Sequence, residues 1–115
     1  MIMEKLDILL ETNTIDSETH AFVLNTISIL EEQGINAHSD AAHTFLVHLA
    51  MAAARQKIGE TIGLMDAFVI EQVMEDPNYP RALEIWKILD DATPVKFCEE
   101  EITCFYLHLC NVLRG

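Results

Sequence analysis

The stretch from Phe45 to Ala54 most restricts how this chain can fold, because His48 is the one residue in it that is not apolar. Apolar side chains then cover nearly every face of a helix, which is typical of a helix buried at the centre of a bundle. Ser39 is a suitable N-cap, so the sequence predicts a helix from Asp40 to about Lys57. Its many alanines let neighbouring helices approach closely, and we expect other helices to surround it.

Apolar residues at helical spacing, caps, and glycine and proline breaks predict the remaining helices. No strand-like alternation stands out, so the chain is predicted to be all-α, with five main helices and a short extra N-terminal helix. The expected helices besides the central one cover Met3 to Leu10, Asp16 to Gly34, Leu64 to Met74, Pro80 to about Leu89, and about Cys98 to Arg114.

Three of these helices have a distinctive distribution of apolar or acidic residues. The helix from Leu64 has five residues on one stripe, the helix from Pro80 has a wide apolar face, and the last helix is expected to begin with three glutamates favoured by the helix dipole. The expected stripe is Met65, Phe68, Val69, Gln72 and Val73, the wide face is Leu83, Ile85, Trp86, Ile88 and Leu89, and the glutamates are Glu99, Glu100 and Glu101.

The length of 115 residues is that of one domain. We expect an N-terminal extension with a short helix over residues 1–14 and a single helical domain over residues 15–115. The three cysteines are an odd number, and the N-terminus lacks the basic-then-apolar order of a secretory signal, so a reducing cytoplasm is the expected compartment. No apolar run is long enough to span a bilayer, and no membrane contact is expected.

The formal charge of -12, from 19 acidic and 7 basic residues, narrows the range of partners. It would repel the phosphate backbone that supplies most of the affinity for nucleic acids. We therefore expect no direct binding to DNA or RNA. An acidic surface also favours approach to basic partners, although it identifies none of them.

Enzyme and metal-site motifs are not found. The sequence has no glycine-rich phosphate loop, HExxH, CxxC or nucleophile elbow, so we expect no enzymatic activity and no cofactor. Histidines five residues apart and cysteines six apart point to different sides of a helix, which argues against a metal site. One pair at i, i+4 has acceptable spacing, but two ligands are too few. The residues concerned are His38, His43, His48, Cys98, Cys104 and Cys110, and the pair is Cys104 with His108.

His48 and His108 are the more informative residues, because each lies in a strongly apolar helix where a titratable ring needs a partner. Arg55 follows His48 by two turns on the same face, so an anion near His48 would be tolerated. A histidine at the edge of a helix is often simply a packed, hydrogen-bonded residue. Spacing alone leaves both interpretations open.

Two segments resemble the motifs of PTS regulation domains, which respond to the phosphoenolpyruvate-dependent sugar phosphotransferase system. FLVHLAMAAAR resembles the first motif, in which a His is followed by an apolar helical turn and by Arg seven residues on; His48 and Arg55 match these positions. EEEITCFYLHLCNVL resembles the second motif, with His108 between two leucines. DPNYPRALEIWKIL resembles the fourth helix of the family. The resemblance spans roughly residues 15–113.

The resemblance implies a five-helix bundle that forms a homodimer. It implies that PTS phosphocarriers or sugar-transport subunits phosphorylate His48 and His108, with Arg55 as a possible anion partner, in transcription regulation of carbohydrate uptake. Family regulators usually carry a nucleic-acid-binding domain ahead of a tandem pair of regulation domains. Here about fifteen residues precede the bundle, so we expect a stand-alone module that acts through another, unknown regulator.

Two alternatives stay open. A module of the same fold that has lost phosphorylation could dock a partner or a small metabolite. A small metal-dependent or hydrolytic enzyme would require bound metal or an ordered polar pocket around Cys104 and His108.

Overall fold

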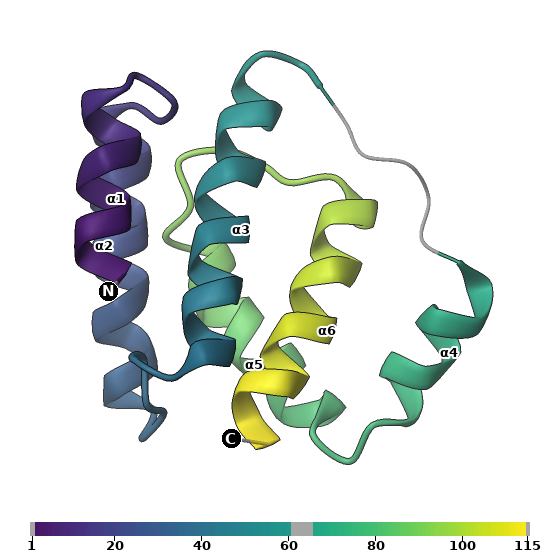
Figure 1. Cartoon of the computed structure of the whole chain (residues 1–115). Coiled ribbons are helices and arrows are strands. Elements are labelled where there is room, and N and C mark those ends of the chain that lie inside the picture. The colour runs from purple at the N-terminus through teal and green to yellow at the C-terminus, as the bar shows by residue number, and fades with distance from the viewer. Residues whose placement is uncertain (1, 61–65, 115) are drawn as a thin grey trace.

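The structure is a computed structural model that describes residues 2–60 and 66–114. Helices and their connections account for all of these residues, so the predicted all-α class is confirmed for the described part of the chain (Figure 1). The helices are α1 (Ile2–Glu11), α2 (Ser17–Glu32), α3 (Asp40–Lys57), α4 (Ala67–Glu75), α5 (Tyr79–Asp90) and α6 (Glu99–Arg114).

Helix α3 lies at the centre of the bundle, as the sequence predicted. It packs against α1 and α2 on one side and against α6 on the other (Figure 1). The side-chain oxygen of Ser39 accepts a hydrogen bond from the backbone N–H of Ala42 at 3.1 Å and caps the start of the helix. Phe45, Leu49 and Ala53 are fully buried. This is expected of a helix that is apolar on nearly every side, because its neighbours shield it from water.

The predicted N-terminal helix is present as α1. It packs against both α2 and α3, and its buried side chains Ile2, Leu6 and Leu9 belong to the same apolar core as those of the other helices. The backbone turns at Asn13, whose φ of 60° lies in the left-handed region that asparagine tolerates. The expected division between residues 1–14 and 15–115 stays a prediction.

Helix α4 differs from its prediction. It begins at Ala67, with Asp66 as its N-cap, and Leu64 and Met65 lie outside the described residues. Among the described residues of the expected stripe only Val73 is buried, and Phe68 is 66% exposed, so sharing the stripe does not bury Phe68. Among the described helices α4 packs against α5 and α6 alone, at the outer side of α6, and two neighbours cover only a narrow strip of a helix (Figure 1).

Helices α5 and α6 complete the core with an aromatic cluster. The Trp86 ring of α5 lies 4.9 Å from the ring of Phe105 in α6 and 5.8 Å from that of Phe97, and Phe105 also meets Phe45 of α3 at 6.1 Å. Such tilted and edge-on contacts are the arrangements that aromatic pairs prefer. Leu83 and Ile88 are partly exposed, so the buried part of α5 is narrower than its apolar face.

No helix in the described residues is both long and apolar enough to cross a membrane.

Candidate functional site

His48 and His108 meet where α3 and α6 pack together. The two helices run antiparallel, so the middle of α3 lies beside the C-terminal half of α6 (Figure 1). Nδ1 of His48 and Nε2 of His108 are 2.8 Å apart, a hydrogen bond between residues 60 positions apart in the chain. The ring centroids are 4.8 Å apart and the ring planes meet at 80°. The structure therefore brings together the two residues that the sequence had marked separately.

Phenylalanines of the core hold the two imidazoles in place. The His48 ring lies edge-on to Phe105 with centroids 5.4 Å apart, and the His108 ring lies 6.5 Å from Phe45. Both phenylalanines are fully buried, while both histidines are half-buried. The imidazole pair thus rests on the aromatic core and lies at its outer edge.

Burial lowers the pKa of both His48 and His108 below the ordinary value of 6.5. The positive charge of Arg55 lowers the pKa of His48 further, and His48 does the same for His108. Both rings are therefore neutral at neutral pH, and each has one N–H and one acceptor nitrogen. Nε2 of His48 is buried and has no hydrogen-bond partner among the described residues.

Arg55 and Glu101 form a second contact between the same helices. Nη2 of Arg55 donates to both carboxylate oxygens of Glu101 at 3.1 Å. The side chain of Glu101 is 3% exposed and that of Arg55 29%. Glu101 lies in the first turn of α6, where the helix dipole was expected to favour it, and its carboxylate is also buried against a cation from α3.

The two contacts are in register. His48 precedes Arg55 by seven residues in α3, and Glu101 precedes His108 by seven residues in α6. Because the helices are antiparallel, His48 meets His108 and Arg55 meets Glu101. Seven residues correspond to a rise of about 10 Å along a helix. We call the set of His48, Arg55, Glu101 and His108 the seam. The matching separations of seven were visible in the sequence, but only the His48–Arg55 spacing had been interpreted.

Cys104 lies in α6 between Glu101 and His108 and is partly buried. Burial raises the pKa of its thiol, and the Glu101 charge raises it further, so the thiol stays protonated and is a weak nucleophile. Within residues 2–60 and 66–114, no group of three or more His, Cys, Asp or Glu side chains is placed to hold a metal ion. The chemistry that the seam offers is that of two neutral imidazoles beside an ion pair.

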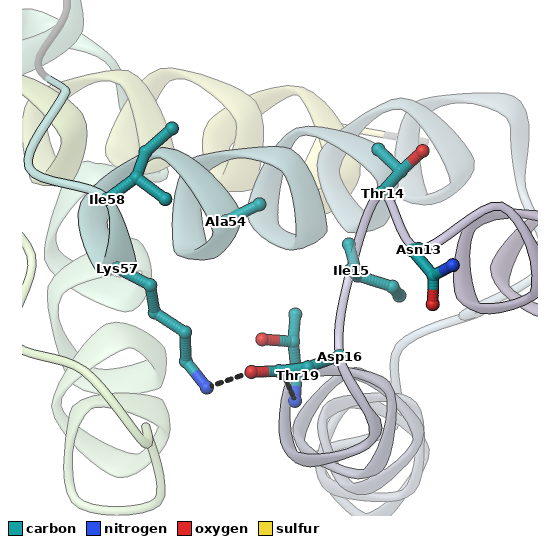
Figure 2. Close-up of a pocket in the computed structure, with 8 residues that line it drawn as sticks. All are labelled: Asn13, Thr14, Ile15, Asp16, Thr19, Ala54, Lys57 and Ile58. Atoms are coloured by element: carbon teal, nitrogen blue, oxygen red, sulfur yellow. Dashed lines mark hydrogen bonds and ion pairs between the residues drawn. The ribbon is translucent and has the colours of Figure 1, made fainter.

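A separate pocket of about 300 Å³ lies between the start of α2 and the end of α3 (Figure 2). Helix α2 lies on the other side of α3 from α6 (Figure 1). The ammonium of Lys57 donates to Asp16 at 2.6 Å and to Glu18 at 2.7 Å. The hydrogen bonds from Lys57 and then from Thr19 lower the pKa of Asp16 to about 2. Because these charged groups already satisfy each other and Asp16 also caps α2, the pocket has a structural explanation.

Comparisons with known proteins found no matching family model, no matching curated protein and no matching solved structure.

Proposed function

We propose that this protein is a regulatory module of the PTS regulation-domain type, switched by phosphorylation of the His48–His108 pair. The observation that carries the proposal is the 2.8 Å hydrogen bond between these two rings. Each histidine was marked by a different motif, and nothing in either motif requires the rings to meet. Their contact is the arrangement that a shared regulatory site needs.

The remaining parts of the proposal follow the resemblance. Helices α2 to α6 would be the five helices of the family bundle, with α1 as an extra helix. The donor is a PTS phosphocarrier or sugar-transport subunit, which places the protein in the cytoplasm. The protein acts as a homodimer, needs no cofactor, catalyses no metabolic reaction, and regulates transcription linked to carbohydrate uptake through contacts with a downstream regulator.

The ion pair beside the two histidines supports a physical route by which phosphorylation would change the shape of the protein. A phosphoryl group replaces a neutral ring by one that carries about two negative charges and three acceptor oxygens. Arg55 lies on the same seam, and its charge already influences His48. A phosphoryl group would compete with Glu101 for Arg55, and a Glu101 left alone would be a buried, unpaired carboxylate. The two states then differ in how α3 and α6 pack.

Intact-mass measurement tests this function. The purified protein is incubated with phosphoenolpyruvate, the general PTS enzymes and the phosphocarrier, and we expect an acid-labile gain of one phosphoryl group. His43→Ala is the control, since His43 lies in the same helix as His48 but outside the seam. It should gain the same mass, and a variant with both His48→Ala and His108→Ala should gain none.

An unchanged mass in every sample would contradict the proposal. The same fold would then be a docking or metabolite-binding module, in which the histidine pair is a packed, hydrogen-bonded part of the core.

A further inference from the structure

The four ring nitrogens of the histidine pair are in different situations. Nδ1 of His48 and Nε2 of His108 are occupied by their mutual hydrogen bond. Nε2 of His48 is sealed from solvent and has no partner in the described part of the chain. Nδ1 of His108 is neither part of that hydrogen bond nor one of the buried side-chain atoms that lack a partner. It is the nitrogen that the pair leaves for an incoming group.

We infer that the pair accepts a single phosphoryl group, on Nδ1 of His108, and that His48 is a positioning residue that acts through its hydrogen bond to Nε2 of the same ring. This inference rests on the proposed function and assigns different roles to two residues that the family motifs treat alike. His48 is enclosed by the Phe105 ring and by its partner imidazole, so its own nitrogens do not meet a donor.

The hydrogen bond determines whether His108 can react, because a neutral imidazole is nucleophilic only at the nitrogen without a proton. If Nδ1 of His48 carried the proton of the bond, the proton of His108 would be on its Nδ1 and would block that atom. If Nε2 of His108 donates to Nδ1 of His48, the lone pair of His108 is on Nδ1. Neutral His48 can accept this hydrogen bond, and the lowered pKa of His48 keeps it neutral.

The transfer step is then balanced. The lone pair on Nδ1 of His108 attacks the phosphorus of a phosphohistidine donor whose other ring nitrogen is protonated. A new N–P bond forms as the donor's N–P bond breaks, and the donor leaves as a neutral imidazole. The proton on Nε2 of His108 passes to Nδ1 of His48 as the phosphorylated ring becomes more acidic. The adjacent phosphoryl charge stabilises the His48 imidazolium, and the proton stays in the hydrogen bond between Nδ1 of His48 and Nε2 of His108, so none has to leave the pair.

A second phosphoryl group is excluded by space and charge. A phosphoryl group on either hydrogen-bonded nitrogen would occupy the position of the partner ring, whose nitrogen is 2.8 Å away. It would also place a second dianion beside the first in a half-buried site. The guanidinium of Arg55, which is the cation of the seam and is shared with Glu101, would already be drawn to the first phosphoryl group.

Two donors separate this inference from the proposed function. Potassium phosphoramidate phosphorylates histidines without a protein partner, and the phosphocarrier system tests the biological route. Phosphorus NMR of the intact protein distinguishes Nδ1-phosphohistidine from Nε2-phosphohistidine, and intact mass counts the phosphoryl groups. The matched variants are His48→Asn, whose side-chain oxygen can replace Nδ1 as acceptor, and His108→Gln, whose amide can replace Nε2.

With the phosphocarrier system we expect one phosphoryl group per wild-type chain, as the Nδ1 isomer. Phosphoramidate can also reach the other three histidines, so with this donor we expect one more Nδ1 group in the wild type than in His108→Gln. His48→Asn should keep this isomer, and His108→Gln should abolish phosphorylation at the seam. His48→Ala should shift the signal to the Nε2 isomer, because it frees that nitrogen of His108, and a purely structural role for His48 would not change the isomer.

Two phosphoryl groups added by the phosphocarrier, an Nε2 isomer formed by it in the wild type, or an equal number of phosphoryl groups in the wild type and His108→Gln would overturn the inference and leave the proposed function intact. Reaction with phosphoramidate but not with the phosphocarrier would overturn the proposed function and, with it, the regulatory meaning of this assignment. No reaction with either donor would overturn both.

Discussion

Glu101 depends more than any other residue of the seam on its partner, because its carboxylate is buried and Arg55 is bound to both of its oxygens. Arg55→Met should lower the free energy of unfolding by about 2–4 kcal/mol, since it leaves an uncompensated charge inside the protein. The loss is at the lower end for buried pairs because part of Arg55 is exposed. Urea unfolding measures it, and the double variant Arg55→Met with Glu101→Leu should recover most of it.

Lys57→Met is the control for this comparison. Lys57 also binds carboxylates, but those of Asp16 and Glu18 are 51% and 65% exposed. Exposed ion pairs contribute about 0–1 kcal/mol, so this variant should lose little. Equal losses in Arg55→Met and Lys57→Met would show that the burial of Glu101 has no energetic consequence.

The histidine pair should make stability depend on pH. The pKa of both His48 and His108 is lowered in the folded protein, so the unfolded chain binds more protons wherever the pH lies between the lowered values and 6.5. Stability rises with pH in that window. The contribution of this histidine pair to the free energy of unfolding should therefore be complete above pH 6.5. It should decrease as the pH drops below 6.5.

Urea unfolding at a series of pH values measures this slope. The double variant His48→Gln with His108→Gln should flatten it, whereas the pKa of Asp16, about 2, lies outside the window and should not contribute. A slope that is the same in the double variant would mean that other groups cause it.

Sequence reasoning at this scale found the two histidines and Arg55, because each lies in an apolar helix where a polar group needs an explanation. It could not find the contact between the rings, since no local pattern relates positions 48 and 108. It also assigned Glu101 to an open helix start, because the dipole effect is local whereas the partner is supplied by another helix.

At the scale of the helices, N-cap residues predicted where helices begin more reliably than apolar spacing predicted which side of a helix is buried. Asp16 and Ser39 start α2 and α3 as predicted, since a cap bonds to a backbone N–H three residues away and needs no tertiary contact. The stripe of α4 does not show that Phe68 is exposed, because periodicity shows which residues share a side of a helix, whereas neighbouring helices decide which side is covered.

Substitutions in α4 test its orientation. Phe68→Ser should change the free energy of unfolding by less than about 0.5 kcal/mol, as for most exposed sites. Val73→Ala should lower it by about 1–3 kcal/mol, because Val73 is the buried apolar residue of this helix. Chemical denaturation compares the two. A larger loss for Phe68→Ser than for Val73→Ala would contradict the orientation of α4, in which Val73 is buried and Phe68 is exposed.

At the scale of the whole molecule, α1 provides a test of where the domain begins. Leu6 is fully buried in the common core, so Leu6→Ala should cost about 2–5 kcal/mol. Trp86, the single tryptophan, is buried in α5 and reports on the far part of the bundle. If α1 belongs to one cooperative unit, Trp86 fluorescence and circular dichroism should shift together.

Ile8→Ala is the control, since Ile8 lies in the same helix and is mostly exposed. It should leave both transitions near those of the wild type. An unchanged Trp86 transition in Leu6→Ala would instead support the expected division of the chain at residue 15.

The all-α class and the central position of α3 could be predicted because both follow from apolar patterning along the chain. The role of α1 in the core could not be predicted, because its few apolar residues become buried only through packing against α2 and α3. The same holds for the seam, which exists only through the antiparallel packing of α3 and α6.

The ion pairs have a consequence for the solution around the protein. Four of the seven basic side chains, Arg55, Lys57, Arg81 and Arg114, are held by carboxylates of the same chain. A molecule of net charge -12 then draws a cloud of dissolved cations around it. Any further negative charge is balanced largely by that ion atmosphere, whose extent is about 8 Å at physiological ionic strength. The ease of adding charge to this protein therefore depends on the salt in which it is dissolved.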